Sequence, residues 1–394
     1  MLDVLRGFAL LGIMVMNMEG FNMPGSSWAM EPRPFQGPLD MTVAFITTTV
    51  FAGKANSIFS FLFGVGMAIQ LQRAATRGGG MVPVYLRRLL VLGLIGAAHA
   101  TLLWNGDVLH AYALLGLLLL AVRRASDRTL WSLIAVFLVA PMLGSLWVWY
   151  AQEPPLHPIP YYQALAQEHI RVFQQGTYAA QVGVRVHEIY EGYILLAPRL
   201  QGWMWLYPMF GVTMLLGFMA GRRRLFSDVQ VHAATFRRVM VWCLGLGVAV
   251  AMAFALMMAL RPTPTGVPTL FDAVASSLYN LNRPLLCVGY VAAISLLFQR
   301  ERVRRWLLPL ASAGSMPLTN YLMQSVIATT IFYSHGFGLF ATVGPALGFV
   351  IAVTIFAVQV VYSRAWLRRF RFGPLEWLWR GAAYGRLPKL RVGP

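Results

Sequence analysis

Long apolar runs follow one another along the whole chain and set the strongest limit on its fold. A helix needs about 20 apolar residues to cross a hydrocarbon core about 30 Å thick, and lipid admits only helices or closed barrels. The runs exceed barrel strands in length and lack their apolar–polar alternation. We therefore expect an all-α polytopic membrane protein with about ten transmembrane helices. The expected spans are Leu2–Met18, Val43–Gln70, Leu86–Leu103, Asp107–Val122, Leu130–Tyr150, Trp203–Ala220, Val239–Leu260, Leu270–Phe298, Trp306–Tyr333 and Val343–Tyr362.

Composition agrees with a lipid environment. Of the 394 residues, 58% are hydrophobic and 12% are charged, whereas soluble domains carry about 25% charged residues. Cys243 and Cys287 both lie inside apolar runs, which predicts packing residues rather than a disulfide or a metal site. No small-residue cleavage site follows the first run, so we interpret it as a retained helix and not as a signal peptide.

Connections rich in Lys and Arg alternate along the chain with connections that contain few of them. The net charge is +18, and 24 of the 32 Lys and Arg residues fall in every second connection. Cytoplasmic loops carry such an excess, so both termini are expected in the cytoplasm. These clusters suit lipid headgroups, and their position between apolar runs argues against a nucleic-acid surface. They are Arg73, Arg77, Arg87 and Arg88; Arg123, Arg124 and Arg128; Arg222, Arg223, Arg224, Arg237 and Arg238; Arg300, Arg302, Arg304 and Arg305; and eight residues from Arg364 to Arg391.

The spans group into three regions. Residues 1–150 are expected to form a five-helix membrane region, 151–202 an extracytoplasmic cap, and 203–394 a second five-helix region with a cytoplasmic tail. In the middle region Ile170, Phe173 and Tyr178 recur at helical spacing, which predicts one or two helices over the outer face. Such helices would either narrow the access to a cavity or form a simple amphipathic connector, and both interpretations stay open.

Ionisable and polar residues inside spanning helices are costly and usually face a cavity or a partner. Asp3 and Arg6 lie three residues apart at the cytoplasmic end of the first span, so they share a helix face. They predict either an ion pair that fixes the helix end or a site where Arg6 binds an anionic ligand. Asn17, near the outer end of the same helix, is a further candidate binding residue.

The second span contains a glycine before Lys54, so we expect it to bend or to begin at the membrane interface. A membrane-embedded lysine needs an anion or a water-filled space. Lys54, Ser57 and Arg283, the last in the eighth span, are therefore candidate substrate-binding residues. Gly64 and Gly66 predict close helix packing rather than a phosphate loop, because the strand and spacing of a Walker motif are missing.

A candidate acid–base pair lies at the turn between the third and fourth spans. His99 ends one span and Asp107 begins the next across a three-residue turn, so the two side chains can meet. A carboxylate beside an imidazole fixes its tautomer and raises its basicity, as in a general base. The alternative is a structural histidine that ties the hairpin together. His110, one turn further on, is a second candidate.

The ninth span carries a polar group of side chains. Asn320, Tyr321 and Gln324 lie on adjacent turns of one buried helix. Interhelical hydrogen bonds would explain them, and so would a ligand-lined cavity.

Five stretches carry a resemblance to a known family. LDVLRGFAL from residue 2, FSFLFGVG from residue 59, and His99 with WNGDVL from residue 104 resemble the YeiB family. GSMPLTNYLMQS from residue 314 and FGPLEWLWR from residue 372 resemble the carboxy-terminal domain of that family, a domain of unknown function called DUF418. Together these stretches extend over nearly the whole chain.

The family's amino-terminal motif is similar to that of heparan-alpha-glucosaminide N-acetyltransferases and, more distantly, of acyltransferase-3 membrane proteins. Those proteins move an acyl group from cytoplasmic acyl-CoA to an acceptor on the far side. The resemblance implies a bacterial cytoplasmic (inner) membrane protein, an acyl-CoA donor and a small-molecule, sugar or lipid acceptor; a homo-oligomer is compatible with it. The acetyltransferase relatives carry a histidine in the first outer loop, where residues 22–40 contain none, so His99 would take its place.

Two functional hypotheses follow, because a fold does not fix a reaction. In a membrane acyltransferase, His99 oriented by Asp107 would deprotonate the acceptor, and Asn320, Tyr321 or Lys54 would stabilise the oxyanion. In a transporter or flippase, the same polar groups would line a path. A non-catalytic membrane partner is a third hypothesis. The sequence contains no zinc-protease, dinucleotide-binding or hydrolase-elbow motif.

Overall fold

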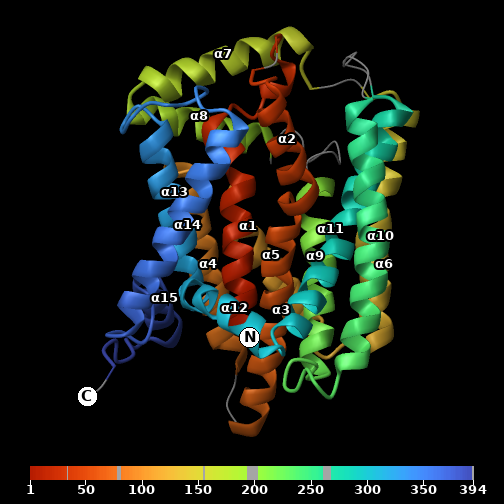
Figure 1. Cartoon of the computed structure of the whole chain (residues 1–394), viewed down its shortest axis with the longest axis vertical. Coiled ribbons are helices and arrows are strands. Elements are labelled where there is room, and N and C mark those ends of the chain that lie inside the picture. Colours follow the sequence, from red (N-terminus) through yellow and green to blue (C-terminus); the bar gives the residue numbers. More distant parts are fainter. Residues whose placement is uncertain (33, 78–80, 154–155, 193–202, 261–267, 393–394) are drawn as a thin grey trace.

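The computed structural model describes residues 1–32, 34–77, 81–153, 156–192, 203–260 and 268–392. Within these ranges the chain has helices, one isolated β-bridge between Phe370 and Arg391, and no strand, which confirms the expected all-α class (Figure 1). The elements are α1 Leu2–Asn22, η1 Ser27–Ala29, α2 Pro38–Ile46, η2 Thr47–Phe51, α3 Lys54–Arg77, α4 Met81–Leu102, α5 Leu109–Ala121, α6 Asp127–Tyr150, α7 Ile159–Gln175, α8 Tyr178–Tyr190, α9 Trp203–Arg222, α10 Ala233–Ala259, α11 Leu270–Leu297, α12 Glu301–Gly314, α13 Pro317–Phe332, α14 Pro345–Leu367 and α15 Pro374–Tyr384.

Several helices are long and apolar enough to cross a membrane, so the chain is a multi-pass membrane protein. Among the described residues seven segments meet this standard. Helices α5, α9 and α13 occupy the other three expected positions. Helices α5 and α13 have 13 and 16 residues, and a rise of 1.5 Å per residue makes them about 20 and 24 Å long, shorter than the hydrocarbon core. The seven segments are Leu2–Asn22, Pro38–Arg73, Val82–Leu102, Asp127–Tyr150, Ala233–Met258, Leu270–Leu297 and Pro345–Leu367.

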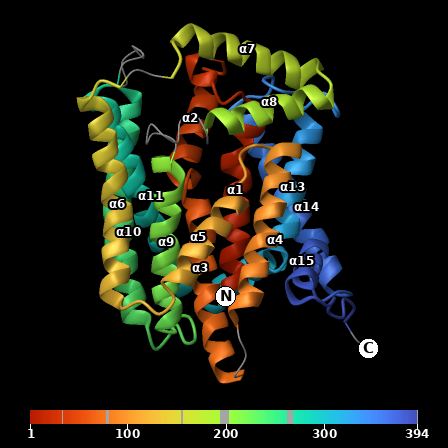
Figure 2. The same ribbon diagram turned by 180° about the vertical axis from the view of Figure 1, so that it is seen from behind.

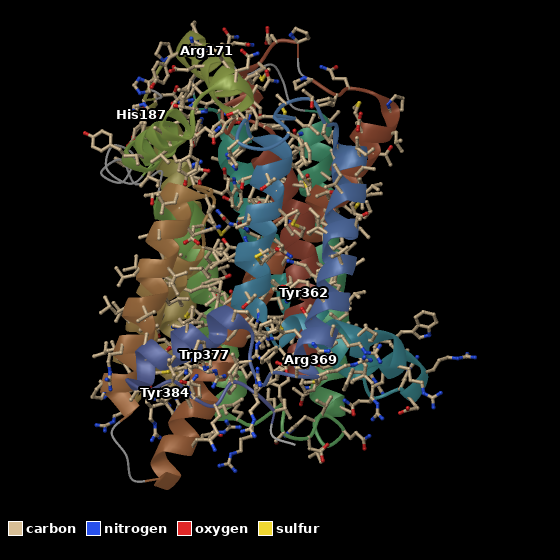
Figure 3. The ribbon with its side chains drawn as sticks, turned by 90° about the vertical axis from the view of Figure 1, so that its left-hand side faces the viewer. Arg171, His187, Tyr362, Arg369, Trp377 and Tyr384 are labelled. Atoms are coloured by element: carbon tan, nitrogen blue, oxygen red, sulfur yellow. The ribbon has the colours of Figure 1, made fainter. Side chains whose placement is uncertain are left out.

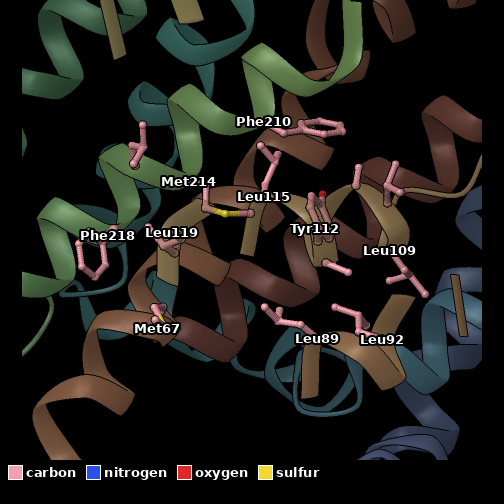
Figure 4. Packing of buried hydrophobic residues seen from close by; sticks show 14 of the residues in the cluster. Met67, Leu89, Leu92, Leu109, Tyr112, Leu115, Leu119, Phe210, Met214 and Phe218 are labelled. Atoms are coloured by element: carbon pink, nitrogen blue, oxygen red, sulfur yellow. The ribbon is translucent and has the colours of Figure 1, made fainter. Parts of the chain in front are cut away.

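The main hydrophobic core lies around the short helix α5, where α3, α4 and α9 meet it (Figure 2). Figure 4 shows Tyr112 and Leu115 of α5 next to Phe210 and Met214 of α9, with Leu89 of α4 on the other side. All five side chains are buried. The core thus surrounds the start of α5, which follows directly on the Asp107 turn.

Helices α6 and α10 form one edge of the bundle (Figure 1). Their apolar side chains are largely exposed; Leu143 is 61% exposed and Trp242 is 72% exposed. A soluble protein rarely presents such a surface, whereas lipid is the solvent that these side chains require.

Helices α3 and α9 cross closely at small residues. A Cβ at Gly64 would lie 2.0 Å from the Met214 carbonyl oxygen, and one at Gly217 would lie 1.9 Å from that of Phe61. Only glycine permits this approach, so the predicted packing role of Gly64 is confirmed. Gly66 faces open space, and a Cβ added there would have no atom within 4 Å, so its predicted packing role is wrong.

The second expected span is broken rather than continuous. Helix α2 runs into the π-helical turn η2, and α3 starts at Lys54 after Gly53. Gly53 has φ +76°, and a Cβ there would lie 2.2 Å from the Arg283 Nε atom. The expected bend is therefore confirmed, and it depends on glycine at this position.

The ninth expected span, Trp306–Tyr333, is not one helix. The chain forms α12, breaks at Ser315 and Met316, and resumes as α13 with Pro317 in its first turn. Helix α12 crosses the lower end of the bundle (Figure 1) and packs against α1. Its exposed side includes arginines and Trp306, which is 82% exposed, as in an amphipathic helix at a membrane surface.

The helix ends that carry the arginine clusters lie at one end of the bundle, together with the start of α1 and the tail helix α15 (Figure 1). Arg222 donates to the Ala125 carbonyl oxygen over 2.8 Å, and Arg223 pairs with Asp127 over 2.8 Å, so two clusters meet directly. The Arg88 guanidinium lies 4.6 Å from the ring centroid of Trp379 in the tail helix α15. We call this end the arginine-rich end.

Helices α7 and α8 lie across the opposite end of the bundle, within the region expected to form the cap (Figures 1 and 2). Figure 3 shows Arg171 and His187 of these helices at that end, far from Arg369, Trp377 and Tyr384 at the arginine-rich end. Phe173 of α7 packs on Tyr333, with 4.5 Å between the ring centroids. We call α7 and α8 the cap helices.

Candidate functional site

The hairpin between α4 and α5 brings His99 and Asp107 into contact. The His99 Nδ1 atom lies 2.8 Å from the Asp107 Oδ2 atom, and both residues are 2% exposed. A short turn after α4 leads back into α5, so the end of one helix faces the start of the next. The predicted pairing of the two side chains is therefore present in the structure.

A second histidine holds the same carboxylate. The Asp107 Oδ1 atom lies 2.8 Å from His110 Nδ1 and accepts from the His110 backbone N–H over 3.1 Å. Each carboxylate oxygen thus contacts a different imidazole. This double attachment fixes the carboxylate plane and leaves little freedom to the His99 ring.

A serine that the sequence patterns did not indicate completes the cluster. The Ser325 Oγ atom of α13 lies 2.8 Å from the His99 Nε2 atom, and Ser325 is 1% exposed. Tyr321, one turn earlier on α13, has its ring centroid 5.2 Å from that of His99. The four-residue spacing of Tyr321 and Ser325 places them on one helix face, a signal that could have indicated Ser325.

Gly96 makes room for this arrangement. A Cβ at Gly96 would lie 2.6 Å from the His110 backbone nitrogen and 2.8 Å from the Asp107 Oδ1 atom. Helix α4 can therefore approach the start of α5 only because position 96 has no side chain. Gly96 precedes His99 by one turn, so the same helix face both admits the carboxylate and carries its imidazole partner.

Asn320 and Gln324 point to a different neighbour. Asn320 Nδ2 donates to the Ala313 carbonyl oxygen over 2.9 Å and to Ser363 Oγ over 3.1 Å. Gln324 Nε2 donates to Gln359 Oε1 over 3.0 Å. Their partners on α14 make these residues interhelical hydrogen-bonding groups between α13 and α14, the first of the two interpretations offered by the sequence.

Lys54, Ser57 and Arg283 lie at the break between α2 and α3. Lys54 is 1% exposed, and its Nζ atom donates to the Thr48 carbonyl oxygen over 2.9 Å. Ser57 Oγ donates to the Gly53 carbonyl oxygen over 2.7 Å. The Arg283 guanidinium lies against Gly53, so two buried cations meet where the helix is interrupted.

The first helix carries the remaining predicted residues. Arg6 and Asp3 form an ion pair at the arginine-rich end, as the simpler interpretation expected, with side chains 30% and 45% exposed. Asn17 is buried in α1. Neither position contributes to the His99 hydrogen bonds.

The cap helices form hydrogen bonds with the hairpin that carries Asp107. Tyr178 donates its hydroxyl to the Leu102 carbonyl oxygen over 2.7 Å, and Arg185 donates to the same oxygen over 3.3 Å. The Asn105 amide donates to the Glu188 carboxylate. Burial raises the pKa of the Glu188 carboxyl to about 7, with Arg185 lowering it by a smaller amount.

A pocket of about 320 Å³ lies beside the cap, at the ends of α1 and α14 that are away from the arginine-rich end. Glu19, Asn22 and Thr48 line it together with Trp28, whose ring centroid is 5.2 Å from that of Tyr162 in α7. Thr48 also accepts the hydrogen bond from Lys54, so one residue connects the pocket wall to the helix break. Among the described residues, no group of three or more His, Cys, Asp or Glu side chains is placed to hold a metal ion.

Comparison with known proteins identifies relatives over nearly the full length. Residues 220–386 match the family described as "Protein of unknown function (DUF418)". The chain is 35% identical over 401 residues to the uncharacterized protein YxaH of Bacillus subtilis, which covers 97% of this chain and 93% of that protein. It is 28% identical over 391 residues to the uncharacterized protein YeiB of Escherichia coli, which covers 96% of this chain and 94% of that protein. No solved structure matches. The chain belongs to the YeiB family of DUF418 proteins, as its sequence motifs predict.

Proposed function

We propose that this protein is a membrane acyltransferase that moves an acyl group from cytoplasmic acyl-CoA to a sugar or lipid acceptor of the cell envelope. The observation that carries the proposal is the buried His99–Asp107 contact of 2.8 Å. A carboxylate that holds Nδ1–H makes Nε2 the atom that accepts a proton from a hydroxyl or amine. The resemblance of the amino-terminal motif to heparan-alpha-glucosaminide N-acetyltransferases supports the same reaction.

In this proposal the arginine-rich end faces the cytoplasm, as the positive-inside rule requires. The chain then crosses the inner membrane ten times, and both termini lie inside. The phosphates of acyl-CoA would approach the arginine-rich end, and the acceptor would enter near the cap, where the pocket lined by Glu19 and Asn22 opens. The donor and the acceptor would meet at the acid–base pair, which lies at the hairpin beneath the cap.

The oxyanion that forms on the acyl carbonyl needs a hydrogen-bond donor. We assign this role to Tyr321, which is buried, has its ring beside His99 and has its hydroxyl close to the Asp107 carboxylate. Asn320 is a poorer choice, because its amide group already donates to Ala313 of α12 and to Ser363 of α14.

The proposal is tested by acyl transfer with purified full-length protein. Labelled acetyl-CoA and palmitoyl-CoA are offered together with envelope lipid and sugar extracts, and the product is followed by mass spectrometry. We expect His99→Ala to lower turnover by about 100-fold or more, as removal of a general base does. The matched control is His232→Ala, because His232 at the start of α10 makes no side-chain capping bond. Absence of transfer by the wild-type protein, or equal turnover in both variants, contradicts the proposal.

One observation favours a transporter or flippase as the second candidate. The α2–α3 segment is interrupted at Gly53, and two buried cations, Lys54 and Arg283, meet at the break. Broken helices with charged groups mark substrate sites in many transporters. Substrate flux into proteoliposomes without acyl-CoA, abolished by Lys54→Met and unaffected by His99→Ala, would favour this candidate over acyl transfer.

A further inference from the structure

Three groups form a hydrogen-bonded line from α13 to α4 and on to the turn before α5. The Ser325 Oγ atom lies 2.8 Å from His99 Nε2, and His99 Nδ1 lies 2.8 Å from Asp107 Oδ2. An ionised carboxylate only accepts hydrogen bonds, so Nδ1 carries the ring proton and Nε2 accepts from the serine hydroxyl. A hydroxyl, an imidazole and a carboxylate in this order activate serine as a nucleophile.

Ser325 differs from buried hydroxyls that are satisfied within their own helix or by a backbone carbonyl oxygen, because its partner is an imidazole. Ser57, Thr213 and Ser295 each donate to a carbonyl oxygen four residues earlier in the chain, over 2.7 to 3.1 Å. That bond satisfies a hydroxyl in lipid with no chemical consequence. The Ser325 hydroxyl instead points across to α4 and meets a base.

We propose that Ser325 is the nucleophile that carries the acyl group between donor and acceptor. This inference rests on the proposed acyl transfer and adds a covalent step to it. The Ser325 Oγ atom attacks the thioester carbonyl carbon while its proton passes to His99 Nε2. The C–S bond breaks, CoA leaves as the thiol with that proton, and an ester on Ser325 remains.

The second half of the reaction returns the serine. A hydroxyl or amine of the acceptor attacks the ester carbon and gives its proton to His99 Nε2. The C–Oγ bond breaks, the acyl group stays on the acceptor, and Ser325 takes back the proton. No oxidant or reductant enters either step.

The position of Ser325 suits a carrier between two sides. It lies eight residues after Pro317, where α13 begins beside α15 at the arginine-rich end, and seven before Phe332, where α13 ends beneath the cap. At 1.5 Å per residue, each end of the helix is about 10–12 Å away. An ester formed there lets the donor leave one side before the acceptor binds from the other.

Burial also suits an ester intermediate. Ser325, His99 and Asp107 are each 1–2% exposed. Exclusion of water slows hydrolysis of a bound acyl group until the acceptor arrives.

The experiment looks for the intermediate in the full-length protein without an acceptor. Purified protein in nanodiscs receives acetyl-CoA or palmitoyl-CoA, and intact mass and peptide mapping follow. We expect one acyl group per chain on Ser325 in the wild-type protein and none in Ser325→Ala, with transfer to the acceptor lowered at least about 100-fold. Ser325→Cys, which keeps a nucleophile, should retain an adduct as a thioester that neutral hydroxylamine cleaves. Ser295→Ala is the matched control, because Ser295 is fully buried and bonds only within its own helix.

The outcomes separate the two proposals. Thermal unfolding first verifies that Ser325→Ala is folded. If Ser325→Ala then transfers acyl groups as well as the wild-type protein while His99→Ala does not, transfer is direct and the nucleophile assignment is overturned. If the wild-type protein transfers nothing from either acyl-CoA, the proposed function fails and the serine step fails with it. An acyl group mapped to another residue also overturns the assignment.

Discussion

The carboxylate of Glu376 links the tail helix α15 to the helix that carries Ser325. Glu376 is 6% exposed and accepts from the Leu318 N–H over 2.6 Å, from the Thr319 N–H over 3.0 Å and from the Thr319 hydroxyl over 2.5 Å. These N–H groups belong to the first turn of α13, where a helix has no internal acceptors and its dipole favours an anion. A residue 58 positions away from Leu318 thus supplies the N-terminal cap.

Removal of this cap has a cost that the contacts allow us to calculate. A hydrogen bond to a charged group contributes about 1.5–3 kcal/mol, and a buried donor left without an acceptor costs about 1–3 kcal/mol. The Thr319 hydroxyl can turn to another acceptor, and the contributions are not additive. We therefore expect Glu376→Ala to lower the free energy of unfolding by about 3–5 kcal/mol. Glu376→Gln keeps an acceptor for both N–H groups and should cost about 1–2 kcal/mol.

The assay is unfolding of the purified protein in mixed micelles with increasing dodecyl sulfate, followed by circular dichroism. Glu301→Ala is the control, because Glu301 pairs with Arg304 and Arg305 on α12 while 56% of its side chain is exposed. Exposed pairs contribute about 0–1 kcal/mol. The expected order of destabilisation is Glu376→Ala, Glu376→Gln and then Glu301→Ala. A Glu376→Ala protein that unfolds together with the Glu301→Ala protein refutes the capping argument.

Two more predictions concern the hairpin. Gly96→Ala places a Cβ 2.8 Å from Asp107 Oδ1, so it should lower acyl transfer by more than about tenfold because the carboxylate is displaced. The control Gly66→Ala, whose added Cβ meets no atom within 4 Å, should leave acyl transfer unchanged. Equal activities of the two variants would contradict the steric argument. The second concerns Glu188, whose carboxyl has a pKa of about 7 in the folded protein and about 4.5 when unfolded. Its ionisation therefore removes about 3 kcal/mol of stability as the pH rises from about 4.5 to 7, with no further loss above. The free energy of unfolding of Glu188→Gln should not show this decrease. If the stability of the wild-type protein and of Glu188→Gln changes in parallel between about pH 5 and pH 8, the carboxyl is not buried as described.

The hairpin was predictable because its contacts are local. His99 and Asp107 are eight residues apart on two helices joined by a short turn, so sequence spacing alone brings them together. The Ser325 contact joins residues 226 positions apart. Local spacing places Ser325 on the same helix face as Tyr321, but its contact with His99 depends on how α13 packs beside α4 and α5.

The polar residues of α13 show a second limit of sequence reasoning. Asn320 and Tyr321 are neighbours, yet consecutive residues on a helix point about 100° apart. Asn320 and Gln324 therefore face α14, and Tyr321 and Ser325 face His99. Composition marks all of them as polar in lipid, whereas only the helix rotation decides which pair meets the imidazole.

The break in the ninth span escaped prediction for a different reason. The stretch from Trp306 to Tyr333 is apolar enough to continue as one helix, and Pro309 does not interrupt α12. The chain turns instead at Ser315 and Met316, before Pro317. Proline is well tolerated in the first turn of a new helix, so Pro317 is compatible with the end of one helix and the start of another. The Glu376 cap supplied by α15 then satisfies the new helix start.

The structure ties the candidate acid–base centre to both ends of the molecule. Asp107 lies two residues after Asn105, which donates to Glu188 of the cap, and Ser325 lies in the helix that Glu376 caps at the other end. The turn that carries Asp107 lies outside both helices, so its position depends on these outer contacts as well as on His110. A small displacement of a reacting group costs a large part of its catalytic effect. The cap is therefore expected to set the geometry of the His99–Asp107 pair and not only the access to it.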